Sequence, residues 1–228
     1  MRLAALFTGG KDSTYAIYLA KGQGHNLVGL ITLKSENPSS YMFHTPAIEL
    51  TKLQAQALEL PIIFGTTKGE KEKELIDLEL VIKKAQKKLH FEGLITGALF
   101  SEYQSSRIQK IADKLGLKVI SPLWHKAQEK EMEELLKLNF KIIFTAVAAE
   151  GLDKSWLNRV INSKDLDHLK QLNKKYQFHL AGEGGEFESA VLDCPLFSQK
   201  IVIEDFMIEE ESEHTARLII KKARLDPK

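Results

Sequence analysis

Short apolar runs alternate along the chain with longer amphipathic segments. The runs are almost continuously apolar, which is typical of strands covered by helices on both faces. They lie at 3–7, 26–33, 61–67, 93–99, 118–123 and 141–147. Between them, apolar positions recur about every 3.6 residues, which predicts helices. These helical segments lie at 14–21, 48–58, 70–89, 108–115 and 129–138. This alternation predicts an α/β fold: right-handed βαβ units in a doubly wound, Rossmann-like parallel sheet.

The pattern changes after residue 148. Segments 151–161 and 165–176 have helical spacing, 182–189 is rich in glycine, and 199–225 predicts two long antiparallel strands. We therefore divide the chain at residue 125, into a nucleotide-binding domain (1–125) and a smaller α+β C-terminal domain for the substrate (126–228). The apolar run at 141–147 fits either half.

Composition narrows the class of protein. The 228 residues are 43% hydrophobic and 28% charged, as in globular proteins, and the net charge of +1 argues against a nucleic-acid partner. Cys194 is the only cysteine, so an internal disulfide and a CxxC pair are excluded. No apolar stretch reaches the roughly 20 residues that cross a bilayer, and the first apolar run is too short for a signal sequence. We expect a cytoplasmic protein that does not enter a membrane.

The segment TGGKDS, Thr8–Ser13, joins the first predicted strand to a helix. Glycines at such a junction let backbone N–H groups approach a phosphate, and the helix dipole favours the anion. The segment does not fit the Walker A motif, because Ala5 stands at its first glycine and Asp12 follows the lysine. The glycines at 22–29 do not fit GxGxxG either, since a strand follows them.

TGGKDS resembles the SGGxDS loop of the N-type ATP pyrophosphatase superfamily, with threonine at the first position. The resemblance implies an adenine nucleotide α-hydrolase-like fold of the HUP type and cleavage of ATP between its α- and β-phosphates. It also implies that the loop amides and the Ser13 hydroxyl bind pyrophosphate, that Lys11 offsets its charge and that Asp12 holds Mg²⁺. ATP and Mg²⁺ are the expected cofactors. The implied nucleotide contacts in the loop are Thr8, Gly9, Gly10, Lys11, Asp12 and Ser13, of which Lys11, Asp12 and Ser13 take part in catalysis.

Three further motifs follow in order: SSYMFHTP at 39–46, TGALFSEYQSSRI at 96–108 and GEGGEFES at 182–189. Together with TGGKDS they resemble the diphthine–ammonia ligase (diphthamide synthase) family, in a compact archaeal-like form. The departures are Thr8 for serine, Ala98 where many relatives have aspartate, and Ser189 for threonine. The resemblance implies that ATP activates the diphthine carboxylate of translation elongation factor 2 as an acyl-adenylate. Ammonia, or ammonium, then displaces AMP and leaves the amide, diphthamide.

The remaining site residues are assigned by their place in these motifs and in the sheet. Ligands bind at the carboxyl ends of parallel strands, and the superfamily places adenine near the second strand. The further nucleotide contacts are Thr32, Leu33, His44 and Gly97. The expected substrate contacts are Ser101, Tyr103, Gln104, Arg107, Glu183, Gly184, Gly185, Glu186 and Glu188. We further expect Glu186 to act in catalysis, because clustered carboxylates repel one another unless they meet a cation. Phe187, Trp124 or Trp156 would provide an aromatic surface against that cation.

Two alternatives remain open at this stage. One is an RNA-modifying enzyme of the same superfamily, against which the near-neutral charge and single cysteine count. The other is a regulatory protein of the universal-stress type, which binds ATP without cleaving it and carries its glycine loop later in the chain. The sequence also leaves the assembly open, with a homodimer as one option.

Overall fold

The computed structural model describes residues 1–36, 48–70, 72–99 and 101–228. Five strands near the N-terminus form a parallel sheet in the order β3-β2-β1-β4-β5. They are β1 (Arg2–Leu6), β2 (Asn26–Ser35), β3 (Ile62–Thr67), β4 (Gly93–Ile95) and β5 (Lys118–Ile120). The order reverses at β1, since β2 lies on one side of it and β4 on the other. The predicted doubly wound α/β class is confirmed.

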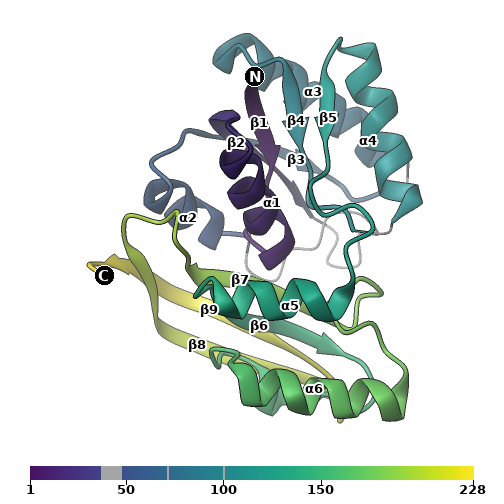
Figure 1. Ribbon diagram of the computed structural model, residues 1–228, viewed down its shortest axis with the longest axis vertical. Coiled ribbons are helices and arrows are strands. Elements are labelled where there is room, and N and C mark those ends of the chain that lie inside the picture. The colour runs from purple at the N-terminus through teal and green to yellow at the C-terminus, as the bar shows by residue number, and fades with distance from the viewer. Residues whose placement is uncertain (37–47, 71, 100) are drawn as a thin grey trace.

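Helices cover both faces of this sheet (Figure 1). They are α1 (Lys11–Gly22), α2 (Leu50–Ala57), α3 (Lys73–Leu89) and α4 (Glu102–Lys114). Neighbouring residues of a strand point to opposite faces, and β1 shows the consequence. Leu3 and Ala5 join the core under α1 and α2, whereas Ala4 joins a separate core under α3 and α4.

A second, antiparallel sheet follows in the order β7-β6-β9-β8. Its strands are β6 (Lys141–Ala148), β7 (Phe187–Asp193), β8 (Lys200–Ser212) and β9 (Thr215–Asp226). The run at 141–147 therefore belongs to the C-terminal sheet. Helices α5 (Gln128–Lys137) and α6 (Ser163–Tyr176) lie beside the second sheet (Figure 1), and Lys170 of α6 pairs with Glu129 and Glu133 of α5. No described helix is long and apolar enough to span a membrane.

The prediction of a helix over 151–161 is wrong. Only Lys154–Trp156 is helical, as one turn of 3-10 helix. Leu157 and Val160 instead form isolated bridges to Phe144 and Ile143 of β6, so pairing with a buried strand replaces the helix. The predicted strand at 93–99 is also shorter than expected, because the chain leaves the sheet after Ile95.

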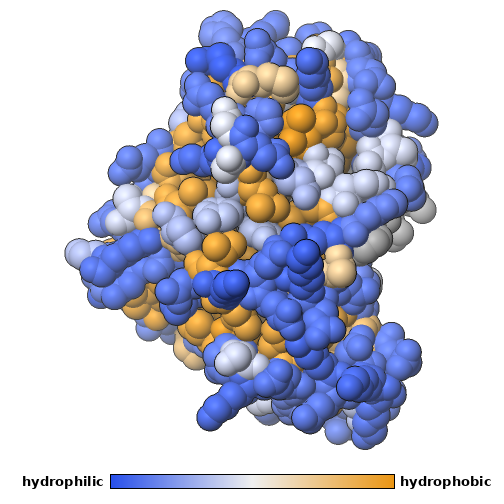
Figure 2. All heavy atoms as spheres, viewed as in Figure 1, coloured by the Kyte–Doolittle hydropathy of each residue, from blue (hydrophilic) through white to orange (hydrophobic). Residues whose placement is uncertain are grey.

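One hydrophobic core crosses from the first sheet to the second. It contains Phe7 and Tyr15 from the N-terminal part together with Phe140 and Phe144 from the C-terminal part. The rings of Tyr15 and Phe140 meet edge to face with centroids 5.9 Å apart. On the face shown in Figure 2, hydrophilic residues cover the outer parts, and hydrophobic patches lie across the middle.

Candidate nucleotide and acceptor site

A cavity of about 520 Å³ opens where β1 ends, at the point where the strand order reverses. Both halves of the chain line it, since Thr145 and the segments 181–185 and 187–189 lie opposite the phosphate loop. This position is the usual ligand site of a doubly wound sheet. The cavity collects most of the residues assigned from sequence: Thr8, Gly10, Lys11, Asp12, Ser13, Leu33, Gly97, Ser101, Gln104, Glu183, Gly184, Gly185 and Glu188.

The phosphate loop is closed by hydrogen bonds between its own residues. The Thr8 hydroxyl lies 3.3 Å from the Ser13 hydroxyl and accepts from the Gly10 N–H at 3.4 Å. Ser13 and Thr14 in turn donate to the Gly10 carbonyl. Helix α1 begins at Lys11, and Gly10 provides no side-chain cap. The first N–H groups of a helix lack intrahelical acceptors, so this end of α1 can hold an anion.

Gly9 has a structural role in the loop and is not among the residues that line the cavity. Its φ is +79°, and a Cβ there would lie 2.1 Å from Gln54 Oε1, so only glycine fits. The buried Gln54 amide donates to the Gly9 carbonyl (2.8 Å) and to the Val191 carbonyl of β7 (2.9 Å). The Val191 N–H also donates to the Gly9 carbonyl. These contacts fix the loop against the C-terminal sheet.

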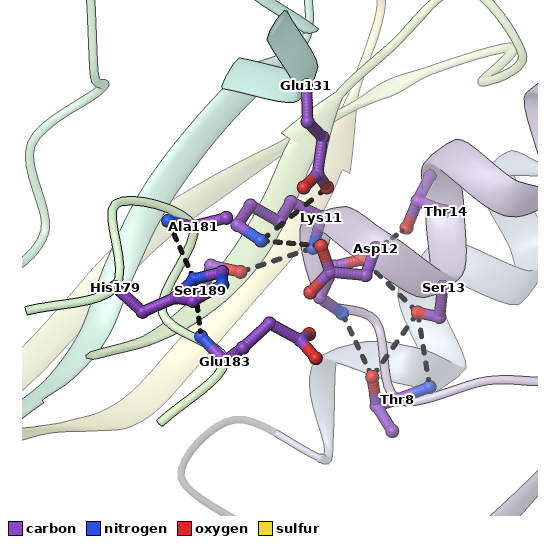
Figure 3. Close-up of polar contacts among 11 residues, drawn as sticks. Thr8, Lys11, Asp12, Ser13, Thr14, Glu131, His179, Ala181, Glu183 and Ser189 are labelled. Carbon is purple, nitrogen blue, oxygen red and sulfur yellow. Dashed lines mark hydrogen bonds and ion pairs between the residues drawn. The ribbon is translucent and has the colours of Figure 1, made fainter. Parts of the chain in front are cut away.

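The Lys11 side chain is buried and meets two carboxyl groups (Figure 3). Its Nζ lies 2.5 Å from Asp12 Oδ1 and 3.7 Å from Oε1 of Glu131, a fully buried residue of α5. Burial alone would lower the pKa of Lys11, but Asp12 and Glu131 outweigh it and raise that pKa. For Glu131, burial outweighs the attraction of Lys11 and raises the pKa to about 9. At neutral pH the Lys11 side chain is therefore a buried ammonium and Glu131 is protonated.

The acidic segment 182–188 is shaped by its own polar contacts. The Glu186 carboxylate accepts from the His179 N–H (2.7 Å) and the Gly184 N–H (2.8 Å), and Glu186 does not line the cavity. His179 Nδ1 accepts from the N–H groups of Ala181 and Glu183. Burial lowers the pKa of His179, which favours the neutral ring that this acceptor role requires. Glu183 extends from the segment toward the phosphate loop (Figure 3).

Besides Gly9 and Glu186, three further assigned residues lie away from the cavity lining. The Thr32 hydroxyl is buried and donates to the Phe7 carbonyl at 2.7 Å. Tyr103 and Arg107 of α4 both contact Glu72, and the Arg107 guanidinium lies 3.4 Å from the centre of the Tyr103 ring.

His44 lies outside the described residues. Of the proposed aromatic wall, Phe187 lines the cavity and stacks on Phe144, whereas neither tryptophan is among the lining residues.

Gly97 holds the segment after β4 against the start of α1. A Cβ there would lie 2.7 Å from the backbone of Asp12 and of Ser13. Within the described ranges, no three His, Cys, Asp or Glu side chains are placed to hold a metal ion. Mg²⁺ in nucleotide sites is commonly held by one or two carboxylates and the substrate phosphates. Asp12, which is partly exposed in the cavity, fits that pattern.

Four residues of this region were missed by sequence reasoning as site residues: Gln54, Glu131, His179 and Ser189. A signal existed for Gln54, since it stands on the buried face of a helix. Ser189 ends a motif that had already been singled out. Glu131 lies among other glutamates of α5, and nothing in the local sequence separates it from them.

Fold and site together define an α/β protein with a nucleotide-type phosphate loop that faces an acidic loop from a second sheet. A family model for the diphthamide synthase N-terminal domain matches residues 1–119, and one for the diphthamide synthase C-terminal domain matches 127–225. The chain belongs to the diphthamide synthase family.

Curated relatives carry the name diphthine–ammonia ligase. The Bos taurus protein is 34% identical over 90% of this chain and 83% of its own length. The Schizosaccharomyces pombe protein is 32% identical over 93% of this chain and 38% of its own length. A solved structure, described as a predicted subunit of tRNA methyltransferase from Methanocaldococcus jannaschii, covers 86% of this chain and 98% of its own at 18% identity and a TM-score of 0.43.

Proposed function

We propose that this protein is an ATP-dependent diphthine–ammonia ligase that completes diphthamide synthesis. The observation that carries the proposal is a single cavity in which the phosphate loop, 8–13, faces the acidic segment 182–188. Membership in the diphthamide synthase family supports the substrate, a protein that carries diphthine. We extend this to translation elongation factor 2 as that protein and to the cytoplasm as the place of reaction.

The phosphate loop would bind the pyrophosphate part of ATP. Backbone N–H groups at the start of α1 would donate to its oxygens, and the buried Lys11 ammonium would offset part of its charge. The Ser13 hydroxyl would turn from the Gly10 carbonyl to donate to the same oxygens. Asp12 would hold Mg²⁺, which supplies charge neutralisation on the phosphates when it is bound. These groups stabilise the negative charge that builds up as the α–β bond breaks.

The acidic segment would bind the acceptor. Diphthine carries a quaternary ammonium group close to the carboxylate that reacts, and Glu183 and Glu188 line the cavity with negative charge. Phe187 adds an aromatic surface, which attracts such cations. The carboxylate would attack the α-phosphorus, pyrophosphate would leave, and ammonia would displace AMP from the acyl-adenylate. Ser101 and Gln104, at the start of α4, lie on the same cavity wall and would orient the acceptor.

The test is incubation of the protein with ATP, ammonium and elongation factor 2 that carries diphthine. We expect AMP and pyrophosphate in equal amounts, together with a mass change on the factor that converts one carboxyl group to an amide. AMP formation that requires tRNA and leaves the factor unchanged would favour an RNA-modifying enzyme. ATP binding with no AMP under any of these conditions would favour a regulatory protein.

A further inference from the structure

The phosphate loop receives one hydroxyl group from a distant part of the chain. Ser189 lies on β7, in the C-terminal sheet, and lines the same cavity as Lys11 and Ser13. Its Oγ accepts a hydrogen bond from the Lys11 N–H at 3.2 Å (Figure 3). That N–H is the first of helix α1, and it is among the groups through which such a helix binds phosphate.

The position of this hydroxyl is fixed by the backbone around it. Two residues further along β7, the Val191 N–H donates to the Gly9 carbonyl at 3.0 Å, and Gln54 bridges the carbonyls of both residues. Gly10 permits the close approach of the strand, since a Cβ there would lie 3.3 Å from the Ser189 carbonyl oxygen. Ser189 is thus held in one register against the loop.

The Ser189 hydroxyl makes one hydrogen bond among the described residues, although it has three positions for them. A serine hydroxyl has one proton to donate and two lone pairs to accept with. The Lys11 N–H occupies one acceptor position, and the Ser189 proton has no acceptor among the described residues. A neighbouring anion in the cavity would supply that acceptor.

We propose that Ser189 is a phosphate-binding residue of this site, which the C-terminal sheet contributes to the ATP loop. Its hydroxyl accepts from the Lys11 N–H and donates to a β- or γ-phosphate oxygen, beside the donors at the start of α1. This proposal rests on the proposed function for the presence of ATP in the cavity. It adds that nucleotide binding requires a correctly docked β7, the strand that also carries the end of the acidic segment.

The test compares Ser189→Ala and Ser189→Thr with a matched control, Ser198→Ala. The Ser198 hydroxyl also links the two halves, by donating to the Ala57 carbonyl at 3.1 Å, but it does not line the cavity. Equilibrium binding of ATP, pyrophosphate and adenosine is measured in the presence of Mg²⁺, and thermal melting reports on the fold. A hydrogen bond to a charged group typically contributes a factor of about ten to a hundred in affinity.

Ser189→Ala should therefore weaken ATP and pyrophosphate at least about tenfold and leave adenosine unchanged, and Ser189→Thr should restore both. Ser198→Ala should bind all three as the wild type does. A role of Ser189 as a helix cap alone would lower the melting temperature and leave ATP affinity intact, which would overturn the proposal. Equal loss of adenosine would also overturn it, because that indicates general distortion. Failure of the wild type to bind ATP would overturn the proposed function itself, and this inference with it.

Discussion

Glu131 illustrates how strongly the surroundings of a single residue decide its charge. It is a fully buried carboxyl group beside Asp12, and the Lys11 ammonium 3.7 Å away does not compensate for its burial. Lys11 already has a closer partner in Asp12. Burial therefore keeps Glu131 protonated at neutral pH, although it lies beside a lysine.

The first prediction is that Glu131→Gln stabilises the protein increasingly as pH rises. The pKa of Glu131 is raised to about 9 in the folded state, against 4.5 for an ordinary glutamate. Between these values the folded state binds one more proton than the unfolded state, so the free energy of unfolding falls as pH increases. Glutamine removes this dependence. The stability difference between variant and wild type should grow by up to about 1.4 kcal/mol per pH unit.

Urea unfolding of both proteins at several pH values from about 6 to about 8.5, which lie between the two pKa values of Glu131, measures this difference. A difference that does not change with pH would show that Glu131 is ionised in the folded protein.

The second prediction concerns Glu186, whose carboxylate accepts two backbone N–H groups. Glu186→Gln replaces one accepting oxygen with an NH₂ group, which then faces a second donor at His179 or Gly184. The acidic segment 182–188, which places Glu183 in the cavity, should therefore lose its present conformation. We expect amide formation to be abolished while ATP affinity stays within about twofold of wild type, since Glu186 is not in the phosphate loop.

Amide formation by mass spectrometry and ATP binding by calorimetry are compared with Glu213→Gln, in the exposed turn between β8 and β9. Full amidation by Glu186→Gln would contradict the assigned role.

For single residues, the sequence could show only which residue types occur in a recognisable motif. TGGKDS and GEGGEFES led to Lys11, Asp12, Ser13 and Glu183, all of which line one cavity. The motif could not separate Glu183 from Glu186, because that distinction depends on which N–H groups the backbone turns toward each carboxylate. Nor could it find Glu131, whose burial arises only when α5 packs beside α1.

At the scale of elements, the junction of loop 8–13 with β7 is held by one glycine and one glutamine. The third prediction is that Gly9→Ala disrupts this junction, whereas Gly24→Ala does not. Both glycines have a positive φ, +79° and +82°, so alanine costs about 1–2 kcal/mol at either position. Only at Gly9 does the added Cβ meet another group, Gln54 Oε1, whose side chain must then leave both carbonyls that it bridges.

Gly24→Ala should therefore lower stability modestly and keep the ATP affinity of wild type. Gly9→Ala should lower stability further and weaken ATP binding more than about tenfold, a loss comparable to that of several donors to a charged group. Melting temperature and ATP affinity of the two variants measure these effects. Equal behaviour of the two would show that backbone strain alone matters at Gly9.

The helices and strands that could be predicted from sequence were those whose apolar residues recur with a clear spacing. The five parallel strands and their helices follow from the alternation, because burial on both faces leaves a continuous apolar run. The error at 151–161 has the same origin, since a segment that buries Trp156 and Leu157 against β6 also places apolar residues at helical spacing. Pairing with a strand that is distant in sequence cannot be deduced from local spacing.

At the scale of the molecule, the two halves share both a core and a site. Sequence composition favoured a division near residue 125, and that division stays a prediction. The family models meet in the same region, at 119 and 127, yet the packing crosses it. Tyr15 of α1 packs on Phe140 and donates a hydrogen bond to Glu134, and α1 and α2 both contact β7.

The fourth prediction is that the two halves unfold together. A core that contains Phe7 and Tyr15 on one side and Phe140 and Phe144 on the other loses contacts on both sides when either half opens. The full chain should therefore melt in a single transition, with equal calorimetric and van't Hoff enthalpies. A fragment of residues 1–125 would expose the apolar face of α1 and lack Val191, which donates to the Gly9 carbonyl. It should show no cooperative melting and bind ATP at least about tenfold more weakly than the full chain. Two separate transitions, or a fragment that melts cooperatively and retains ATP affinity, would show that the phosphate loop keeps its shape without the C-terminal sheet.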